Sequence, residues 1–162
     1  MPEHGAAAVI GLKINNYEIV SLLGEGGMGA VYLARHPFIG RYAAIKVLRA
    51  PLAENHTLVT RFVNEARAAN AIQHPNIIDI IDVGTLPGSQ VPYLMMEYLQ
   101  GETLAKRIER RGRLPATEAA EIGYQTASAL GAAHIVGIVH RDLKPDNLFL
   151  VPDPETPGRD RV

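Results

Sequence analysis

Three glycines, Gly24, Gly26 and Gly29, give the sequence a G-x-G-x-x-G spacing. Glycine lets a backbone turn sharply and come close to a phosphate group, because it has no Cβ to obstruct the approach. In a dinucleotide-binding fold this motif opens a helix, but the residues that follow here, A-V-Y-L-A-R at 30–35, favour a strand. The sequence therefore predicts a strand, a glycine loop and a second strand, a hairpin that can fold over a triphosphate.

Lys46 ends the stretch A-A-I-K, and on a strand its side chain shares a face with Ala44 and Leu48. A lysine on an apolar face needs an anionic partner, unless its side chain simply extends along the surface to solvent. Glu65 lies on the flank of a predicted helical apolar face and can supply that carboxylate. We therefore predict a Lys46–Glu65 ion pair that leaves the lysine able to contact phosphate oxygens.

The segment I-V-H-R-D-L-K-P-D-N-L-F-L, residues 138–150, closely resembles the catalytic loop of protein kinases. The family pattern H-R-D-L-x-x-x-N is matched by His140, Arg141, Asp142, Leu143 and Asn147. Lys144, followed by Pro145, resembles the serine/threonine version of the loop. Taken one at a time, Asp142 and Asn147 could merely cap a turn and His140 could pack inside, but the full string argues against both alternatives.

The resemblance extends to further motifs in the family's order: G-E-G-G-M-G-A-V-Y at 24–32, A-A-I-K at 43–46, Glu65, H-P-N-I at 74–77 and M-M-E-Y at 95–98. It covers residues 17 to about 151 and is of the bacterial type. It implies an α+β, protein-kinase-like fold: an antiparallel-sheet N-lobe with one helix and a hinge over 17–99, then the start of a helical C-lobe over 100–162. We expect residues 1–16 to form a flexible leader.

The resemblance also implies where ATP binds. Backbone amides of the glycine loop would hold the phosphates, and Lys46, oriented by Glu65, would contact the α and β phosphates. Met96 would be the gatekeeper, with the hinge backbone after it bonding the adenine edge, although Met95 and Met96 could equally be core fillers. The implied ATP-binding residues are Leu23, Gly24, Glu25, Gly26, Gly27, Met28, Gly29, Ala30, Val31, Ala44, Lys46, Met96, Glu97, Leu99 and Phe149.

Three residues of the catalytic loop receive roles from the same resemblance. Asp142 would accept the proton of a substrate hydroxyl, Asn147 would hold Mg²⁺ through its amide oxygen, and Lys144 would neutralise charge on the γ phosphate. The implied cofactors are ATP and Mg²⁺, and the implied partner is a protein with a Ser or Thr acceptor. The expected function is thus that of an ATP-dependent serine/threonine protein kinase.

Hydrophobic patterns predict the elements that position these residues. Five strands are expected, at 17–23, 30–35, 42–48, 77–83 and 92–99. A helix is expected over 60–72, with Phe62, Ala66, Ala69 and Ile72 on its apolar face, and the H-P-N-I turn ends it.

A second helix is expected to begin at Pro115 and to stop at Gly137. Its inward stripe would consist of Ala119, Ile122, Ala129, Ala133 and Val136. The last twelve residues hold three prolines and several charges, which predicts an exposed loop.

Composition sets limits on function. Sixteen Lys and Arg against seventeen Asp and Glu give a net charge of -1, so bulk charge favours neither nucleic acid nor an anionic membrane as partner. The chain has no cysteine, which fits a reducing compartment. Its N-terminus lacks the basic region of a signal peptide, and no apolar run approaches the roughly 20 residues of a membrane span. We expect a cytoplasmic segment without membrane contact.

The match to the family pattern stops after Phe149, and no D-F-G follows before Val162. In the family that aspartate holds the Mg²⁺ that bridges the phosphates, so we expect little kinase activity from these 162 residues alone. The alternative function is a non-catalytic nucleotide-binding or protein-interaction module of kinase ancestry.

Overall fold

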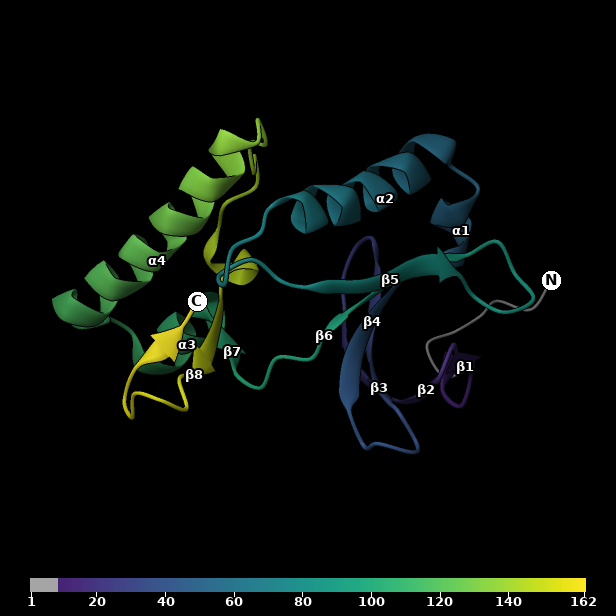
Figure 1. Ribbon diagram of the computed structural model, residues 1–162, viewed down its shortest axis with the longest axis horizontal. Coiled ribbons are helices and arrows are strands. Elements are labelled where there is room, and N and C mark those ends of the chain that lie inside the picture. Colours follow the sequence, from purple (N-terminus) through teal and green to yellow (C-terminus); the bar gives the residue numbers. More distant parts are fainter. Residues whose placement is uncertain (1–8) are drawn as a thin grey trace. The chain divides into compact units, whose positions relative to one another are not determined.

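The computed structural model describes residues 9–162. Contacts between Cα atoms divide the chain into two units (Figure 1). Unit 1 comprises the described residues up to Asn70 together with Ile78–Tyr98, and unit 2 comprises Ala71–Ile77 with Leu99–Val162. None of the helices among the described residues combines the length and the apolar composition that a bilayer span requires.

Unit 1 is built on a six-stranded antiparallel sheet with the order β1-β2-β3-β4-β6-β5. Its strands are β1 (Lys13–Ile14), β2 (Tyr17–Glu25), β3 (Gly29–Arg35), β4 (Tyr42–Leu48), β5 (Ile80–Thr85) and β6 (Pro92–Glu97). The predicted strands at 17–23, 30–35 and 42–48 are confirmed. The fourth begins three residues later than predicted, because Ile77 still belongs to a turn in which its N–H donates to the carbonyl of His74.

The two faces of this sheet bury different sets of side chains. One face, with Tyr32, Ile45 and Tyr93, packs against Val9 and Ile14. The other face, with Leu48 and Leu94, packs against Phe62 and Ala66 of helix α2 (His56–Ala71). A short helix α1 (Ala50–Ala53) precedes α2, and the Asn55 side chain accepts hydrogen bonds from the backbone of Thr57 and Leu58 to cap α2. The predicted helix is confirmed, although Ile72 is buried just after its end.

The expectation of a flexible leader over 1–16 is wrong for residues 9–16; residues 1–8 lie outside the described part. Lys13 and Ile14 pair with β2, and Val9 and Ile14 are buried in the core. The turn that follows β1 also reaches the opposite edge of the sheet: Asn15 donates to Asp82 Oδ2 of β5 at 2.6 Å. Tyr93 of β6 donates to the same oxygen, also at 2.6 Å. These three side chains, which we call the clasp, connect the turn after β1 at one edge of the sheet to β5 and β6 at the other.

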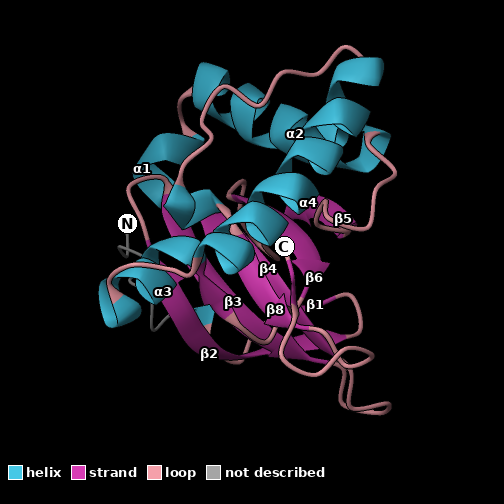
Figure 2. Ribbon diagram, turned by 90° about the vertical axis from the view of Figure 1, so that its left-hand side faces the viewer, coloured by secondary structure: helices cyan, strands magenta, loops and turns pink. Residues whose placement is uncertain are grey.

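Unit 2 contains β7 (Glu102–Thr103), α3 (Leu104–Arg111), α4 (Ala116–Ile135), the 3₁₀ turn η2 (Pro145–Asn147), β8 (Phe149–Pro152) and β9 (Asp160–Arg161). Its three short strands pair in the order β7-β8-β9. Figure 2 distinguishes the helices α3 and α4 from the strand β8 by colour. Thr103 caps α3 by accepting a hydrogen bond from the backbone of Lys106.

Helix α4 follows the prediction at its ends, and Gly137, at φ +75°, adopts the left-handed conformation that terminates it. Ile122, Ala129 and Ala133 are buried as predicted. Ala119 and Val136 are not: both are exposed, so the buried stripe is narrower than the apolar pattern suggested. Packing decides this, because an alanine in a helix is compatible with either environment.

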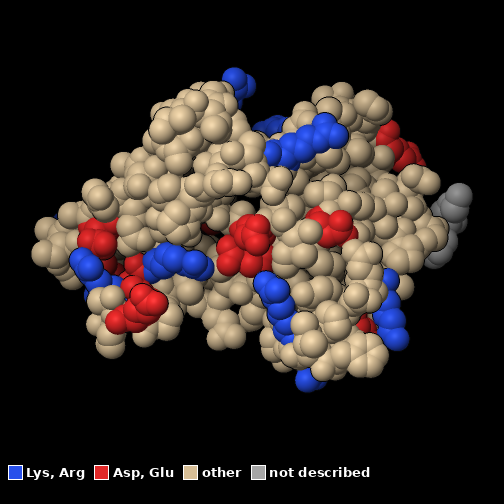
Figure 3. Space-filling model, viewed as in Figure 1, with Lys and Arg blue, Asp and Glu red and all other residues tan. Residues whose placement is uncertain are grey.

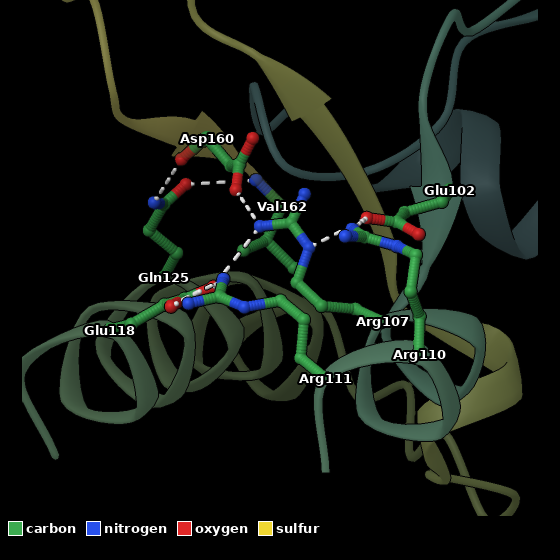
Figure 4. A network of polar contacts seen from close by, with 8 residues as sticks. All are labelled: Glu102, Arg107, Arg110, Arg111, Glu118, Gln125, Asp160 and Val162. Carbon is green, nitrogen blue, oxygen red and sulfur yellow. Dashed lines mark hydrogen bonds and ion pairs between the residues drawn. The ribbon is translucent and has the colours of Figure 1, made fainter. Parts of the chain in front are cut away.

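Arg107 of α3 is the centre of an ion-pair network in unit 2 (Figure 4). Its guanidinium donates to Glu102 at 2.8 Å, to Glu118 of α4 at 3.1 Å, and to Asp160 of β9. Only 13% of the Arg107 side chain is exposed, and the hydrogen bond to Asp160 is the main cause that raises the pKa of this arginine. The network therefore joins two helices and two strands through one cation.

Two side-chain amides, those of Gln125 and Asn76, hold Asp160 and Val162 in place. Gln125 donates to the Asp160 carbonyl and accepts from the Val162 N–H, while Asn76 donates to the Val162 carbonyl at 2.7 Å. Asp160 and Arg161 also pair with β8. The prediction of an exposed terminal loop is therefore wrong for these residues, because partners distant in the sequence fix them.

The Asn15–Asp82–Tyr93 clasp predicts how stability depends on alkaline pH. Burial, and then the hydrogen bond to Asp82, raises the pKa of Tyr93 to about 12. Since an unfolded tyrosine titrates near 10, the stabilisation is complete below about pH 10 and is lost by about pH 12. We expect the free energy of unfolding of the wild type to exceed that of Tyr93→Phe by an amount that falls by roughly 2 kcal/mol over this range.

Denaturant unfolding at several pH values measures this difference. Tyr42→Phe is the control, because Tyr42 is 41% exposed and makes no hydrogen bond through its hydroxyl within the described residues. A pH-independent difference for Tyr93→Phe would contradict the clasp.

Replacement of the network's central cation should destabilise unit 2. Arg107→Met keeps the bulk of the side chain but leaves Asp160 without a cation, since Arg110 and Arg111 bind only Glu102 and Glu118. We expect a loss of about 3 kcal/mol in the free energy of unfolding. Arg113→Met is the matched control, because Arg113 is exposed and has no ion pair among residues 9–162. Similar melting curves for the two variants would show that the network adds no stability.

Candidate active site

The glycine loop lies between β2 and β3, as the sequence predicts. Gly24 and Glu25 pair with Val31 and Ala30, and the loop is closed by a hydrogen bond from Gly26 N–H to the Gly29 carbonyl at 2.8 Å. The loop residues Leu23, Gly24, Glu25, Gly26 and Gly27 are exposed, whereas Met28, Ala30 and Val31 are half-buried. This hairpin presents its backbone to the outside.

The three glycines of the motif differ in whether the fold itself requires glycine at their positions. A Cβ on Gly29 would lie 2.1 Å from the Val47 carbonyl oxygen, so the close approach of β3 and β4 requires glycine there. A Cβ on Gly24 would meet nothing within 4 Å, and one on Gly26 only the Gly29 carbonyl at 3.9 Å. Neither has the positive φ that would itself require glycine. The fold explains Gly29 but leaves open space over Gly24 and Gly26, which is what a phosphate approaching the backbone needs.

Lys46 and Glu65 form the predicted ion pair. Lys46 Nζ lies 3.2 Å from Glu65 Oε1 and 3.4 Å from Oε2, and it also lies 5.6 Å from the centroid of the Phe62 ring. The lysine side chain is 25% exposed and the glutamate 56%. The ammonium is therefore fixed by α2 on one side and still accessible, which excludes the alternative of a lysine merely extended into solvent.

Strand β4 aligns other residues of unit 1 that the sequence predicts for a nucleotide site. Val31 lies opposite Lys46, and Ala44 lies opposite Met96 of β6. Because side chains at paired positions share a face, these residues and Lys46 lie on the same side of the sheet as α2. Ala44 is nearly buried and Met96 half-buried. The backbone there is thus screened by small and apolar side chains, as an adenine ring requires.

Asp79, which was not among the predicted site residues, fixes the chain after Met96 through two hydrogen bonds to Glu97. Glu97 N–H donates to the Asp79 carbonyl at 3.0 Å, and the Glu97 carboxylate accepts from the Asp79 N–H at 3.0 Å. This reciprocal pair fixes the end of β6 before Leu99, which belongs to unit 2. No sequence motif marks Asp79, because both bonds depend on the β5–β6 pairing.

In unit 2 the loop over 140–147 brings together three of its predicted site residues. Asn147 Nδ2 donates to the Asp142 carboxylate at 3.0 Å and to the Asp142 carbonyl at 2.8 Å. Lys144 Nζ lies 3.1 Å from the same carboxylate oxygen. His140 is exposed rather than packed inside, and its Nδ1 accepts from the Asp142 N–H at 3.3 Å. Arg141 has a φ of +63°, so the loop turns through a left-handed residue other than glycine.

The surroundings of Asp142 favour its ionised form. The hydrogen bond from Lys144, and then that from Asn147, lower the pKa of the Asp142 carboxyl below its ordinary value. The carboxylate is 63% exposed, so it remains accessible to a hydroxyl group. The arrangement can accept a proton or orient a hydroxyl donor.

Phe149, one of the implied ATP-binding residues, begins β8 and pairs with Thr103. Gly101 explains how the strands approach: a Cβ there would lie 2.0 Å from the Leu150 carbonyl oxygen and 3.2 Å from the Phe149 ring. Gly101 was not among the predicted site residues, although the glycine of L-Q-G-E-T after an apolar strand is a signal in the sequence.

The donor set fits ATP and Mg²⁺ to different extents. The exposed glycine backbone and the accessible Lys46 ammonium suit phosphate oxygens. For Mg²⁺, the two Asn147 hydrogen bonds use its amide nitrogen and leave the amide oxygen for a metal. No group of three or more His, Asp or Glu side chains suited to a metal occurs between residues 9 and 162. Asn147 is thus one ligand of a site that needs others.

Comparisons with known proteins agree with this geometry. A family model for the protein kinase domain matches residues 17–156. The chain is 47% identical over 143 residues to the serine/threonine-protein kinase Pkn1 of Myxococcus xanthus, covering 88% of this chain and 20% of that protein. It is 41% identical over 143 residues to PrkC of Bacillus subtilis, covering 88% and 22%.

A solved structure shows the same fold. The crystal structure of the Mycobacterium tuberculosis PknI kinase domain matches with a TM-score of 0.75 at 31% identity, covering 93% of this chain and 59% of that chain. The chain spans about a fifth of the length of the curated relatives named above. With the glycine loop, the Lys46–Glu65 pair and the Asp142 loop each in place, and with the family model matching most of its length, the chain belongs to the protein kinase family.

Proposed function

We propose that the chain contributes to ATP-dependent phosphoryl transfer onto a Ser or Thr hydroxyl of a protein. The observation that carries this proposal is the accessible Asp142 carboxylate, held ionised by Lys144 and oriented by Asn147. A turn that only needed capping would require none of these cations or amides around the carboxylate.

In unit 1, Lys46 is the residue that binds phosphate. Its contact with Glu65 orients the ammonium and limits its motion, while its exposed part can donate to the α and β phosphate oxygens. The open backbone of Gly24 and Gly26 supplies N–H groups close to the phosphates. Ala44, Val31 and Met96 exclude water from the adenine, and the backbone of Glu97 to Leu99 binds the adenine edge.

In unit 2, Asp142 accepts the proton of the acceptor hydroxyl. The Lys144 ammonium beside it neutralises charge on the γ phosphate, and Asn147 offers its amide oxygen to Mg²⁺. Mg²⁺, when bound, supplies charge neutralisation on the phosphates. Phosphoryl transfer needs mainly such positioning and charge, since the transferred group brings its own reactivity.

Two observations support serine or threonine as the acceptor. Lys144 occupies the position after Asp-Leu that the serine/threonine version of the loop uses. Both relatives named above are described as serine/threonine-protein kinases.

The proposal predicts Mg²⁺-dependent ATP binding that depends on Lys46. We expect Lys46→Ala to weaken binding roughly tenfold or more, because a charged hydrogen bond to phosphate is lost. Isothermal titration of the 162-residue chain with ATP and Mg²⁺ measures this effect. Lys13→Ala is the matched control, since Lys13 is an exposed strand lysine of the same unit.

The variant Asp142→Asn distinguishes phosphoryl transfer from the alternative function, a non-catalytic nucleotide-binding or protein-interaction module. The variant should retain ATP binding while it loses any transfer of labelled phosphate, because the carboxylate acts on the acceptor and not on the nucleotide. Absence of ATP binding by the wild type would refute a nucleotide site and favour an interaction module. Phosphate transfer by Asp142→Asn at the wild-type rate would remove Asp142 from the mechanism.

The electrostatic environment of Asp142 gives an independent prediction. Lys144→Met removes the main cause of the lowered pKa, so the Asp142 carboxyl should titrate at higher pH in the variant than in the wild type. In the wild type the corresponding stabilisation is present above the ordinary carboxyl pKa and is lost as the pH falls through the lowered value. Carbon-13 NMR of the carboxyl group measures both titrations, and Lys106→Met, at an exposed position of helix α3, is the control. Identical titrations in all three proteins would contradict the arrangement.

A further inference from the structure

We infer that the turn between β3 and β4 docks on an anionic lipid surface. Three consecutive residues, Pro37, Phe38 and Ile39, form the apex of this turn, and we call them the apolar tip. The tip is rigidly built: His36 N–H donates to the Arg41 carbonyl at 2.8 Å and Gly40 N–H to the His36 carbonyl at 2.9 Å. Gly40, at φ +70°, closes the turn in a conformation that suits glycine.

The apolar tip is turned away from the core of its own unit. Phe38 is 91% exposed and Ile39 69%, the highest values among the large apolar residues described in unit 1. The Phe38 ring lies edge-on to His36, with the ring centroids 6.2 Å apart, and His36 in turn lies edge-on to Tyr17. In Figure 1 the turn lies at the ends of β3 and β4, on the side of the sheet away from α2. The fold thus holds two large apolar side chains outward without a structural need for them.

Cations flank the apolar tip. Arg35 and Arg41 adjoin the turn on either side, both are exposed, and neither forms an ion pair with any of residues 9–162. The carboxylate nearest in the strand register is Glu18, which lies between Arg35 of β3 and Lys13 of β1, so one carboxylate faces two cations. Both signs are interspersed on the face drawn in Figure 3, so this basic character is local.

An apolar apex with cations on its shoulders fits the boundary of an anionic bilayer. Apolar side chains enter the acyl region there while arginine guanidinium groups remain at the level of the phosphates. A stable protein partner would need about 800 Å² of surface on each side, far more than a convex tip of three residues offers. We therefore replace the expectation of no membrane contact, which was based on net charge. Binding of the apolar tip to the lipid surface should be weak and reversible.

A tryptophan at the tip reports insertion directly, since the chain contains none. Phe38→Trp should show a blue-shifted emission with vesicles containing about one third phosphatidylglycerol, and quenching by brominated acyl chains. The shift should disappear with pure phosphatidylcholine and weaken at high salt. Ile135→Trp, at a position 87% exposed in unit 2, is the control probe and should not respond. An unshifted Phe38→Trp spectrum, or an equal response of Ile135→Trp, would overturn the inference.

Vesicle sedimentation of the otherwise unmodified chain gives the second test. Phe38→Ser/Ile39→Ser should lower the partition coefficient roughly tenfold, and Arg41→Gln should lower it less. Ile135→Ser/Val136→Ser, an exposed apolar pair without flanking arginines, should leave it unchanged. Unchanged circular dichroism melting curves would exclude unfolding as the cause. If sedimentation velocity instead shows a dimer of the wild type that Phe38→Ser/Ile39→Ser abolishes without lipid, the tip is an interface between copies and the inference fails.

Discussion

The pairing of β4 with β3 and β6 is the constraint on which the candidate nucleotide site of unit 1 depends. In this register Val31 lies opposite Lys46, and Ala44 lies opposite Met96. A slip by one residue would turn Lys46 to the opposite face, where the apolar core lies. Gly29 helps to fix this register, because only glycine allows β3 to approach the Val47 carbonyl so closely. The glycine motif therefore has two roles. Gly29 allows the strands to pack, and the backbone of Gly24 and Gly26 remains open to a ligand.

In unit 2 the candidate site lies on a loop of exposed polar residues, which must be held in place without a hydrophobic core. The loop over 140–147 contributes little to a core, and its order comes from Asp142, Lys144 and Asn147 binding one another. The strands that follow are fixed through Gly101, which lets the backbone approach Leu150, and through Arg107, which binds Asp160. A largely screened cation surrounded by three carboxylates is costly to desolvate, and the arrangement contributes geometric specificity.

Local patterns predicted much of the fold and of the candidate site. Strand alternation and helix periodicity placed the main elements, and the residue string at 138–150 placed the catalytic loop, since these signals lie within a few residues of one another. The errors have two physical causes. Lys13 and Ile14 pair with the nearby Glu18 and Tyr17, but a strand of two residues is too short to show an alternating pattern. Other errors concern contacts between distant residues, and nothing near Asp160 shows its pairing with Arg107. Asp79 was missed for the same reason, because its bonds to Glu97 exist only once β5 and β6 pair.

The clasp at Asn15 has a consequence for which amino acids the position can accept. Its backbone is left-handed, at φ +52°, and its side-chain amide must donate to Asp82. Glycine would suit the backbone but could not donate, aspartate would bring two carboxylates together, and alanine would meet neither requirement. Asparagine alone among these satisfies both conditions. Natural sequence variation at this position should therefore be narrow, although Asn15 is not one of the candidate site residues.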